Sequence, residues 1–309
     1  MPPPETESAA ALLDAPLLDA PLLDARELHA LANLSLISLG RMLEGVAGQR
    51  PGSAHAAGLE LADYRAYARG DDLRLVDWNV YARLRELFVK VAPRERHTTV
   101  DVLLDVSRSM DAGEPGRLRH ARRIAAALGA VALLHEDAAR VWALSDGHAE
   151  PGPRFEGPRM VSRLVAEVAQ IPAGGSTDLA ASARVYAKAR SYSEPVVLIS
   201  DALLSFESLD EALRRAGLQG GAVTLIHVTP DDRRAAARRG RVELRDSESG
   251  ERIELNITGS VLASYRARVA RFEDRVAATC TRTHARYIRA ATDVAPVDLL
   301  AGAAGLVSP

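Results

Sequence analysis

From Thr98 onward the chain alternates short apolar runs with longer amphipathic stretches, and this alternation limits its possible folds more than any other feature. Runs rich in Val, Leu and Ile favour buried strands, whereas apolar residues at helical spacing favour helices packed on a sheet. The apolar runs predict strands at 100–106, 140–144, 196–200, 223–228 and 285–288. The amphipathic stretches predict helices at 118–137, 159–170, 179–190, 208–216 and 260–281. The pattern is typical of an α/β fold with a mostly parallel sheet flanked by helices.

Two folded segments are predicted. Residues 98–309 form the α/β domain, interrupted at about 240–257 by an inserted β-hairpin, because two strand-like runs flank a turn-forming composition there. Residues 26–97 hold one helix and then a small module in which Arg and Asp crowd around aromatic residues. Ion pairs and a small aromatic core would hold this module together, or its arginines would present a docking face.

Residues 1–25 are predicted to be a low-complexity tail. The unit Leu-Leu-Asp-Ala occurs three times in it, and Pro16 and Pro21 interrupt any helix between the copies. Such a segment is expected to be solvated, although its leucine pairs would also suit the groove of a partner protein.

Charge and cysteine content exclude several classes of protein. The 309 residues include 39 Lys and Arg and 41 Asp and Glu, a net charge of −2, which argues against nonspecific binding to nucleic acid. The single cysteine, Cys280, rules out a disulfide within the chain and indicates a reducing compartment, by default the cytoplasm. Acidic residues interrupt the N-terminal apolar stretch, and every other apolar run is too short to span a bilayer. We therefore expect neither a secretory signal nor a transmembrane segment.

Oxygen-bearing side chains follow three of the predicted strands or loops. Asp105, Ser107 and Ser109 follow the first strand, Thr177 precedes a helix, and Asp201 follows the most apolar strand. Because the carboxyl ends of parallel strands meet at one edge of a sheet, these five side chains are expected to converge. A site of oxygen donors without sulfur or imidazole suits a hard divalent cation, Mg²⁺ or Mn²⁺.

The same five positions resemble the metal-ion-dependent adhesion site of von Willebrand factor A domains, whose sheet is Rossmann-like. The resemblance implies that Ser107, Ser109 and Thr177 bind the ion directly or through water, while Asp105 and Asp201 bind mainly through water. It also implies that an Asp or Glu of a partner completes the coordination. The expected function is therefore a non-enzymatic, metal-dependent protein-interaction module.

A longer pattern is similar to a bacterial family known as domain of unknown function 58. It comprises Asp63, Tyr64, Arg65, Tyr67, Asp71, Asp72, Arg74, Asp77 and Trp78, then Ala82 and Arg83, then the metal motif, then Arg245, Asp246 and Gly250. The resemblance implies a partnership with a MoxR-type AAA+ ATPase, for which this protein would be an adaptor or co-chaperone acting on a target complex. Many relatives carry two membrane helices near the N-terminus, where this chain has its Leu-Leu-Asp-Ala repeats.

Two other functions are compatible with these residues. Asp105 at a strand end would also suit a divalent-metal phosphoester hydrolase. The metal site could instead be structural, in a scaffold that presents the aromatic and Arg-rich module. The sequence lacks the phosphate-binding loop, the dinucleotide-binding glycine motif, the nucleophile elbow and the His-Glu-x-x-His motif, so we expect that the protein is not an enzyme.

Overall fold

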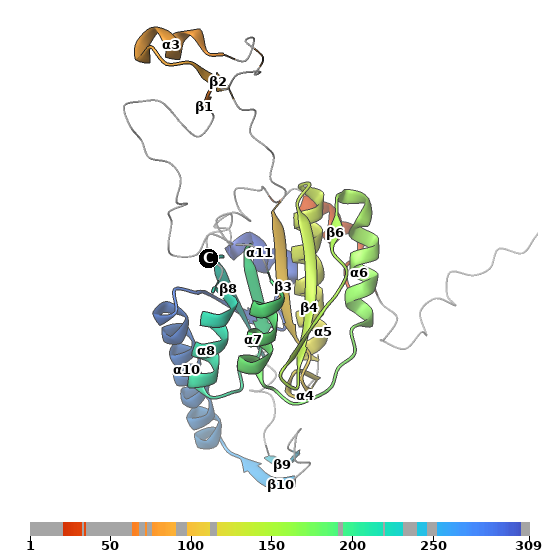
Figure 1. Ribbon diagram of the computed structural model, residues 1–309. Coiled ribbons are helices and arrows are strands. Elements are labelled where there is room, and N and C mark those ends of the chain that lie inside the picture. The colour runs from red at the N-terminus through yellow and green to blue at the C-terminus, as the bar shows by residue number, and fades with distance from the viewer. Residues whose placement is uncertain are drawn as a thin grey trace, which may run out of the picture. The chain divides into compact units, whose positions relative to one another are not determined.

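The computed structural model describes most of the chain and divides it into two compact units (Figure 1). The described residues are 21–32, 34, 64–67, 72, 76–90, 98–111, 116–190, 194–218, 220–230, 240–245 and 252–303. One unit is Ala47–Thr98, and the other combines Met1–Val46 with Thr99–Pro309.

Among its described residues, the smaller unit contains one short helix and a two-stranded antiparallel sheet. Its elements are β1 (Tyr64–Ala66), α3 (Trp78–Leu84) and β2 (Phe88–Lys90). Asp77 caps α3 by accepting hydrogen bonds from the backbone N–H groups of Asn79 and Val80. Val80 is buried, whereas Trp78 is 59% exposed and its ring packs edge-to-face against that of Tyr81, with 6.2 Å between the ring centroids.

The larger unit is built on a seven-stranded sheet with the order β11-β8-β7-β3-β4-β5, in which β6 also pairs with β4. The strands are β3 (Thr99–Asp105), β4 (Ala138–Ser145), β5 (His148–Pro151), β6 (Phe155–Glu156), β7 (Val196–Ser200), β8 (Val223–Thr229) and β11 (Arg286–Ala291). The five strands expected from the apolar runs are all present and pair in parallel. β5 and β6 are additional and pair antiparallel with β4. The predicted α/β architecture with a mostly parallel sheet is therefore confirmed.

Helices cover both faces of this sheet (Figure 1). One face packs against α1 (Ala25–Ala32), α5 (Arg117–Leu134), α6 (Val161–Gln170) and α11 (Pro296–Ala303). The other face packs against α7 (Leu179–Ala189), α8 (Phe206–Ala216) and α10 (Gly259–Arg282). Successive residues of β3 alternate between the two cores, since Val102 and Leu104 belong to the first and Leu103 to the second. Both sheet faces are buried, which explains the continuous apolar runs.

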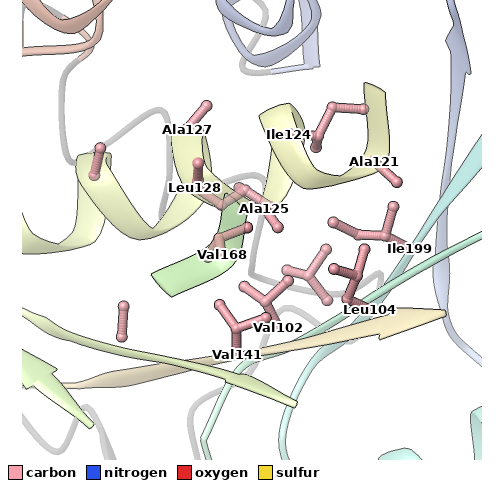
Figure 2. Packing of buried hydrophobic residues seen from close by; sticks show 14 of the residues in the cluster. Val102, Leu104, Ala121, Ile124, Ala125, Ala127, Leu128, Val141, Val168 and Ile199 are labelled. Atoms are coloured by element: carbon pink, nitrogen blue, oxygen red, sulfur yellow. The ribbon is translucent and has the colours of Figure 1, made fainter. Parts of the chain in front are cut away.

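The alanine-rich helix α5 lies in the centre of the first core. Figure 2 shows Ala125 and Leu128 of this helix beside Val102 and Val141 of the sheet. Small side chains allow α5 to approach its neighbours closely, and a Cβ on Gly129 would come within 2.7 Å of the Leu164 side chain of α6. Burial of this long helix is a major source of the unit's hydrophobic stabilisation.

The N-terminal tail is shorter than the sequence predicted. Leu22 and Leu23, the third leucine pair of the repeat, are only 6% and 4% exposed and belong to the core beside α5. Asp24 and Glu27 then form a capping box at the start of α1, with backbone-to-side-chain hydrogen bonds of 2.8 and 3.0 Å. The tail therefore does not extend to residue 25 as a solvated segment. The first helix, grouped with the small module by sequence, packs on the α/β unit instead.

The hairpin expected at 240–257 consists of β9 (Gly240–Arg245) and β10 (Arg252–Ile257), which pair antiparallel and lead into α10.

Among the helices in the described ranges, none combines the length and the apolar character needed to cross a bilayer.

Candidate metal centre

The candidate site lies where β3 and β7, adjacent in the sheet, reach their carboxyl ends. β3 ends at Asp105, and the short helix α4 (Arg108–Asp111) follows it (Figure 1). Two backbone hydrogen bonds fasten the loop before α7 to this segment: Gly174 N–H donates to the carbonyl of Val106 at 2.9 Å, and Arg108 N–H donates to that of Gly175 at 3.1 Å. This attachment brings Thr177 to the end of β3, although 68 residues separate it from Ser109.

Four of the five predicted side chains form a continuous chain of hydrogen bonds. Ser107 Oγ donates to Asp105 Oδ1 at 2.6 Å, and therefore accepts from Ser109 Oγ, 3.1 Å away. Since Ser109 has used its single proton, it accepts in turn from Thr177 Oγ1 at 3.4 Å. Each hydroxyl oxygen keeps a lone pair that is not used in this chain.

The spacing of the hydroxyl oxygens fits a small divalent ion. In an octahedral Mg²⁺ site with metal–oxygen distances of about 2.1 Å, neighbouring ligand oxygens are about 3.0 Å apart. The separations of 3.1 Å between Ser107 and Ser109, and of 3.4 Å between Ser109 and Thr177, are close to that value. Ser107 and Ser109 are buried and Thr177 is half-buried. These residues could therefore hold such an ion.

Asp105 is the terminal acceptor of the hydrogen-bond chain. Its carboxylate is fully buried, and burial raises its pKa to about 6, with a further increase from the charge of Asp201 and opposing hydrogen bonds from Ser107 and Ser200. Ser200 Oγ donates to Asp105 Oδ2 at 2.6 Å and also accepts from the backbone N–H of Ala202 at 3.0 Å. Both carboxylate oxygens are therefore occupied within the protein. Sequence analysis did not identify Ser200, although it immediately precedes Asp201.

Asp201 is held by a different set of contacts. Its Oδ1 accepts from Leu203 N–H at 3.1 Å, and its Oδ2 lies 3.1 Å from Arg117 Nη1, a cation that sequence analysis also missed. The carbonyl of Asp201 accepts a hydrogen bond from Nε2 of His227, which burial keeps neutral by lowering its pKa to about 4. The buried Oδ2 atom accepts no hydrogen bond within the described residues, so a metal-bound water could donate one to it in competition with the Arg117 guanidinium.

The loop that carries Thr177 has its own support. Asp146 Oδ1 accepts from both the backbone N–H and the hydroxyl of Ser176, at 2.6 and 2.9 Å, and these bonds lower the pKa of the Asp146 carboxyl. Asp178 caps α7 by accepting a hydrogen bond from the backbone N–H of Ala181 at 3.0 Å. Neither carboxylate belongs to the hydroxyl chain.

The structure thus brings Asp105, Ser107, Ser109 and Thr177 into direct contact, and it places Asp201 beside them at the end of the adjacent strand. In the part of the chain that the structure describes, no three His, Cys, Asp or Glu side chains gather as a metal-binding group. A site at this edge therefore depends on its hydroxyl groups.

Comparison with known proteins gives relatives over most of the chain. An uncharacterized protein of Mycobacterium tuberculosis is 27% identical over 282 residues, covering 86% of this chain and 88% of the relative. An uncharacterized protein of Mycobacterium bovis matches to the same extent.

Two solved bacterial structures also align. The conserved hypothetical protein BatB from Bacteroides thetaiotaomicron aligns over 68% of this chain and 98% of its own, at 14% identity and a TM-score of 0.44. An aerotolerance-related membrane protein from Bacteroides fragilis aligns over 68% and 100%, at 16% identity and a TM-score of 0.42. The model of the family described as protein of unknown function DUF58 matches residues 63–275, and this chain therefore belongs to the DUF58 family.

Proposed function

We propose that this protein is a non-enzymatic interaction module in which Mg²⁺ or Mn²⁺, held at the carboxyl edge of the sheet, binds an Asp or Glu of a partner protein. The observation that carries the proposal is the chain of three hydroxyl groups, spaced like neighbouring octahedral ligands and ending on the buried Asp105. Ser107, Ser109 and Thr177 would hold the ion, and Asp105 and Asp201 would act mainly through water.

The chemistry of this donor set favours an external carboxylate. Hydroxyl oxygens are neutral, so an ion held by them keeps more of its positive charge than one held directly by several carboxylates. Leu203, two residues after Asp201, is 53% exposed and adds an apolar contact beside the site. A partner surface that combines an acidic residue with an apolar patch would suit this edge.

Within this proposal the partner is a MoxR-type AAA+ ATPase, and the protein acts in the cytoplasm as its adaptor or co-chaperone. The support for this step is membership of the DUF58 family together with the resemblance to von Willebrand A domains. The step is tested by co-purification of the ATPase with Mg²⁺ present, which EDTA is expected to abolish.

The metal site itself is tested by thermal unfolding during a Mn²⁺ titration of the wild type and of Thr177→Val, which removes one hydroxyl with little change in shape. At one hundred times its dissociation constant the ion should add about 2.7 kcal/mol to the stability of the wild type. We expect the variant to lose most of this gain.

Thr281→Val is the matched control, because the Thr281 hydroxyl donates to the carbonyl of Ala277 within α10 rather than to the hydroxyl chain. This variant should respond to Mn²⁺ like the wild type. If the wild type shows no response up to several millimolar, the proposed metal site is wrong, and a scaffold held by its own hydrogen bonds is the better interpretation.

A phosphoester hydrolase using Asp105 as nucleophile is disfavoured by the same geometry. The carboxylate is fully buried, and both of its oxygens accept hydrogen bonds from serine hydroxyls. A nucleophile needs an accessible lone pair directed at its substrate. Metal-dependent turnover of a generic phosphoester that is lost in Asp105→Asn would reverse this conclusion.

A further inference from the structure

Arg117 joins the two strand ends of the candidate site. It is the first residue of α5, and its side chain is 17% exposed. Nη2 donates to the carbonyl oxygen of Ser109 at 2.8 Å, while Nη1 lies 3.1 Å from Asp201 Oδ2. The guanidinium therefore contacts the segment that carries the hydroxyl groups and the carboxylate at the end of β7.

The placement of this cation bears on the charge of the site. Asp105 is fully buried and Asp201 is 1% exposed, and two buried carboxylates so close together are costly without a counter-charge. His227, which contacts the Asp201 carbonyl, is neutral and does not supply that charge. The Arg117 guanidinium is directed at the Oδ2 atom of Asp201.

The same oxygen is the one that a divalent ion would use. Asp201 Oδ1 is already bound to the backbone N–H of Leu203, so Oδ2 is the atom left for a metal-bound water. A guanidinium within hydrogen-bonding distance of this atom competes for it and also repels a second cation nearby.

We propose that Arg117 is the resident counter-cation of this site and that a divalent ion binds by displacing it from Asp201. The inference rests on the proposed function above and concerns its regulation. Exchange of one cation for another weakens the intrinsic metal affinity. The carboxylate that the partner supplies then raises the affinity for the ion, which couples metal binding to docking.

The test compares Mn²⁺ binding to the wild type, Arg117→Gln and Arg119→Gln, measured by the electron paramagnetic resonance signal of free Mn²⁺. Arg119 lies on the same helix and is exposed, so its variant removes an equal charge away from the site. We expect Arg117→Gln to bind Mn²⁺ about tenfold more tightly or better, because the competing charge is gone. Arg119→Gln should stay within about twofold of the wild type, since exposed charges are screened.

The melting temperature distinguishes a change in metal binding from a folding defect. Without metal, Arg117→Gln should melt at a lower temperature than the wild type, because Asp201 loses its counter-charge. Mn²⁺ should then raise its melting temperature by more than it raises that of the wild type.

Arg117→Lys keeps a positive charge in the site and should bind Mn²⁺ within about threefold of the wild type. If Arg117→Lys binds Mn²⁺ as tightly as Arg117→Gln does, the gain in affinity comes from the lost arginine hydrogen bonds and not from the lost charge. The proposed exchange of cations would then be wrong.

The remaining outcomes separate the two proposals. Equal Mn²⁺ affinity in wild type and Arg117→Gln, both sensitive to Thr177→Val, would overturn the exchange and leave the metal site intact. Weaker binding by Arg117→Gln would show that Arg117 supports the metal, which also overturns the exchange. Absence of Mn²⁺ binding in every variant would remove the metal site and the exchange together.

Discussion

At the scale of single residues, Gly175 shapes the loop that carries Thr177. Its φ of +80° lies in the left-handed region, and an added Cβ would collide with Oδ2 of Asp146, a side chain already fixed by two hydrogen bonds from Ser176. We expect Gly175→Ala to destabilise the protein by about 2–3 kcal/mol, from backbone strain plus the displaced loop. Urea unfolding followed by circular dichroism measures this loss.

Gly157 provides the control for that substitution. It has the same φ of +80°, but apart from its chain neighbours no described residue lies within 4 Å of an added Cβ. Gly157→Ala should therefore cost only the backbone term, about 1 kcal/mol. Equal losses in the two variants would show that the contact with Asp146 does not constrain the loop.

Residue patterns predicted part of the site and missed the rest for a physical reason. Asp105, Ser107 and Ser109 could be found because they follow one strand at fixed spacing, and Thr177 because it precedes a helix. Ser200 and Arg117 could not be found in this way. Their roles arise from the adjacency of β7 to β3 and from the position of α5, and tertiary packing sets both.

At the scale of elements, the N-terminal segment is held by a small number of strong contacts. Leu22 and Leu23 are buried in the core, Arg123 Nε donates to the Leu22 carbonyl at 2.9 Å, and Arg123 also pairs with Glu27. The double variant Leu22→Ala with Leu23→Ala should lose about 4–6 kcal/mol of stability, because each truncation removes buried apolar surface and leaves a cavity. Urea unfolding at fixed pH measures the loss.

An exposed leucine of the same unit tests the specificity of that effect. Leu218 is 58% exposed, and Leu218→Ala should change stability by less than about 0.5 kcal/mol. A loss in the double variant no larger than this would mean that the segment is not part of the cooperative core.

The elements that the sequence predicted best are those buried on both sides. Strands β3, β7 and β8 are buried along nearly their whole length and rich in Val, Leu and Ile, so the sequence alone indicates where they lie. The short strands β5 and β6 were missed because they contain few apolar residues and pair only with β4 at the edge of the sheet. The burial of Leu22 and Leu23 was not predicted. The sequence of a repetitive segment interrupted by prolines does not indicate whether its apolar residues pack against the core.

At the scale of the whole molecule, stability should fall on acidification. His120 of α5 is 4% exposed, and burial, aided by the charge of Arg123, lowers its pKa from the ordinary 6.5 to about 4. Between these values the unfolded chain binds the proton and the folded chain does not. The contribution of His120 is therefore complete above pH 6.5 and is lost as pH falls toward 4, by up to about 3 kcal/mol.

Urea unfolding at several pH values between 4 and 7 checks this dependence. His120→Gln, which carries no charge at any pH, should reduce the slope of this fall and leave the contribution of His227, which has the same sign, and that of Asp105, which has the opposite sign. His148→Gln, at an exposed position, should keep the slope of the wild type. An unchanged slope in His120→Gln would assign the acid sensitivity to other groups.

The strand order also determines when the site can form during protein synthesis. β3 lies between β4 on one side and β7 on the other, so the contacts of Asp105 and Ser109 reach forward along the chain by as many as 95 residues. Until β7 has emerged from the ribosome, the carboxylate of Asp105 lacks its Ser200 partner and the site lacks Asp201. Because early segments fold before later ones emerge, an incomplete chain cannot present the edge that we propose for docking. Under that proposal, only a finished domain can recruit a partner through it.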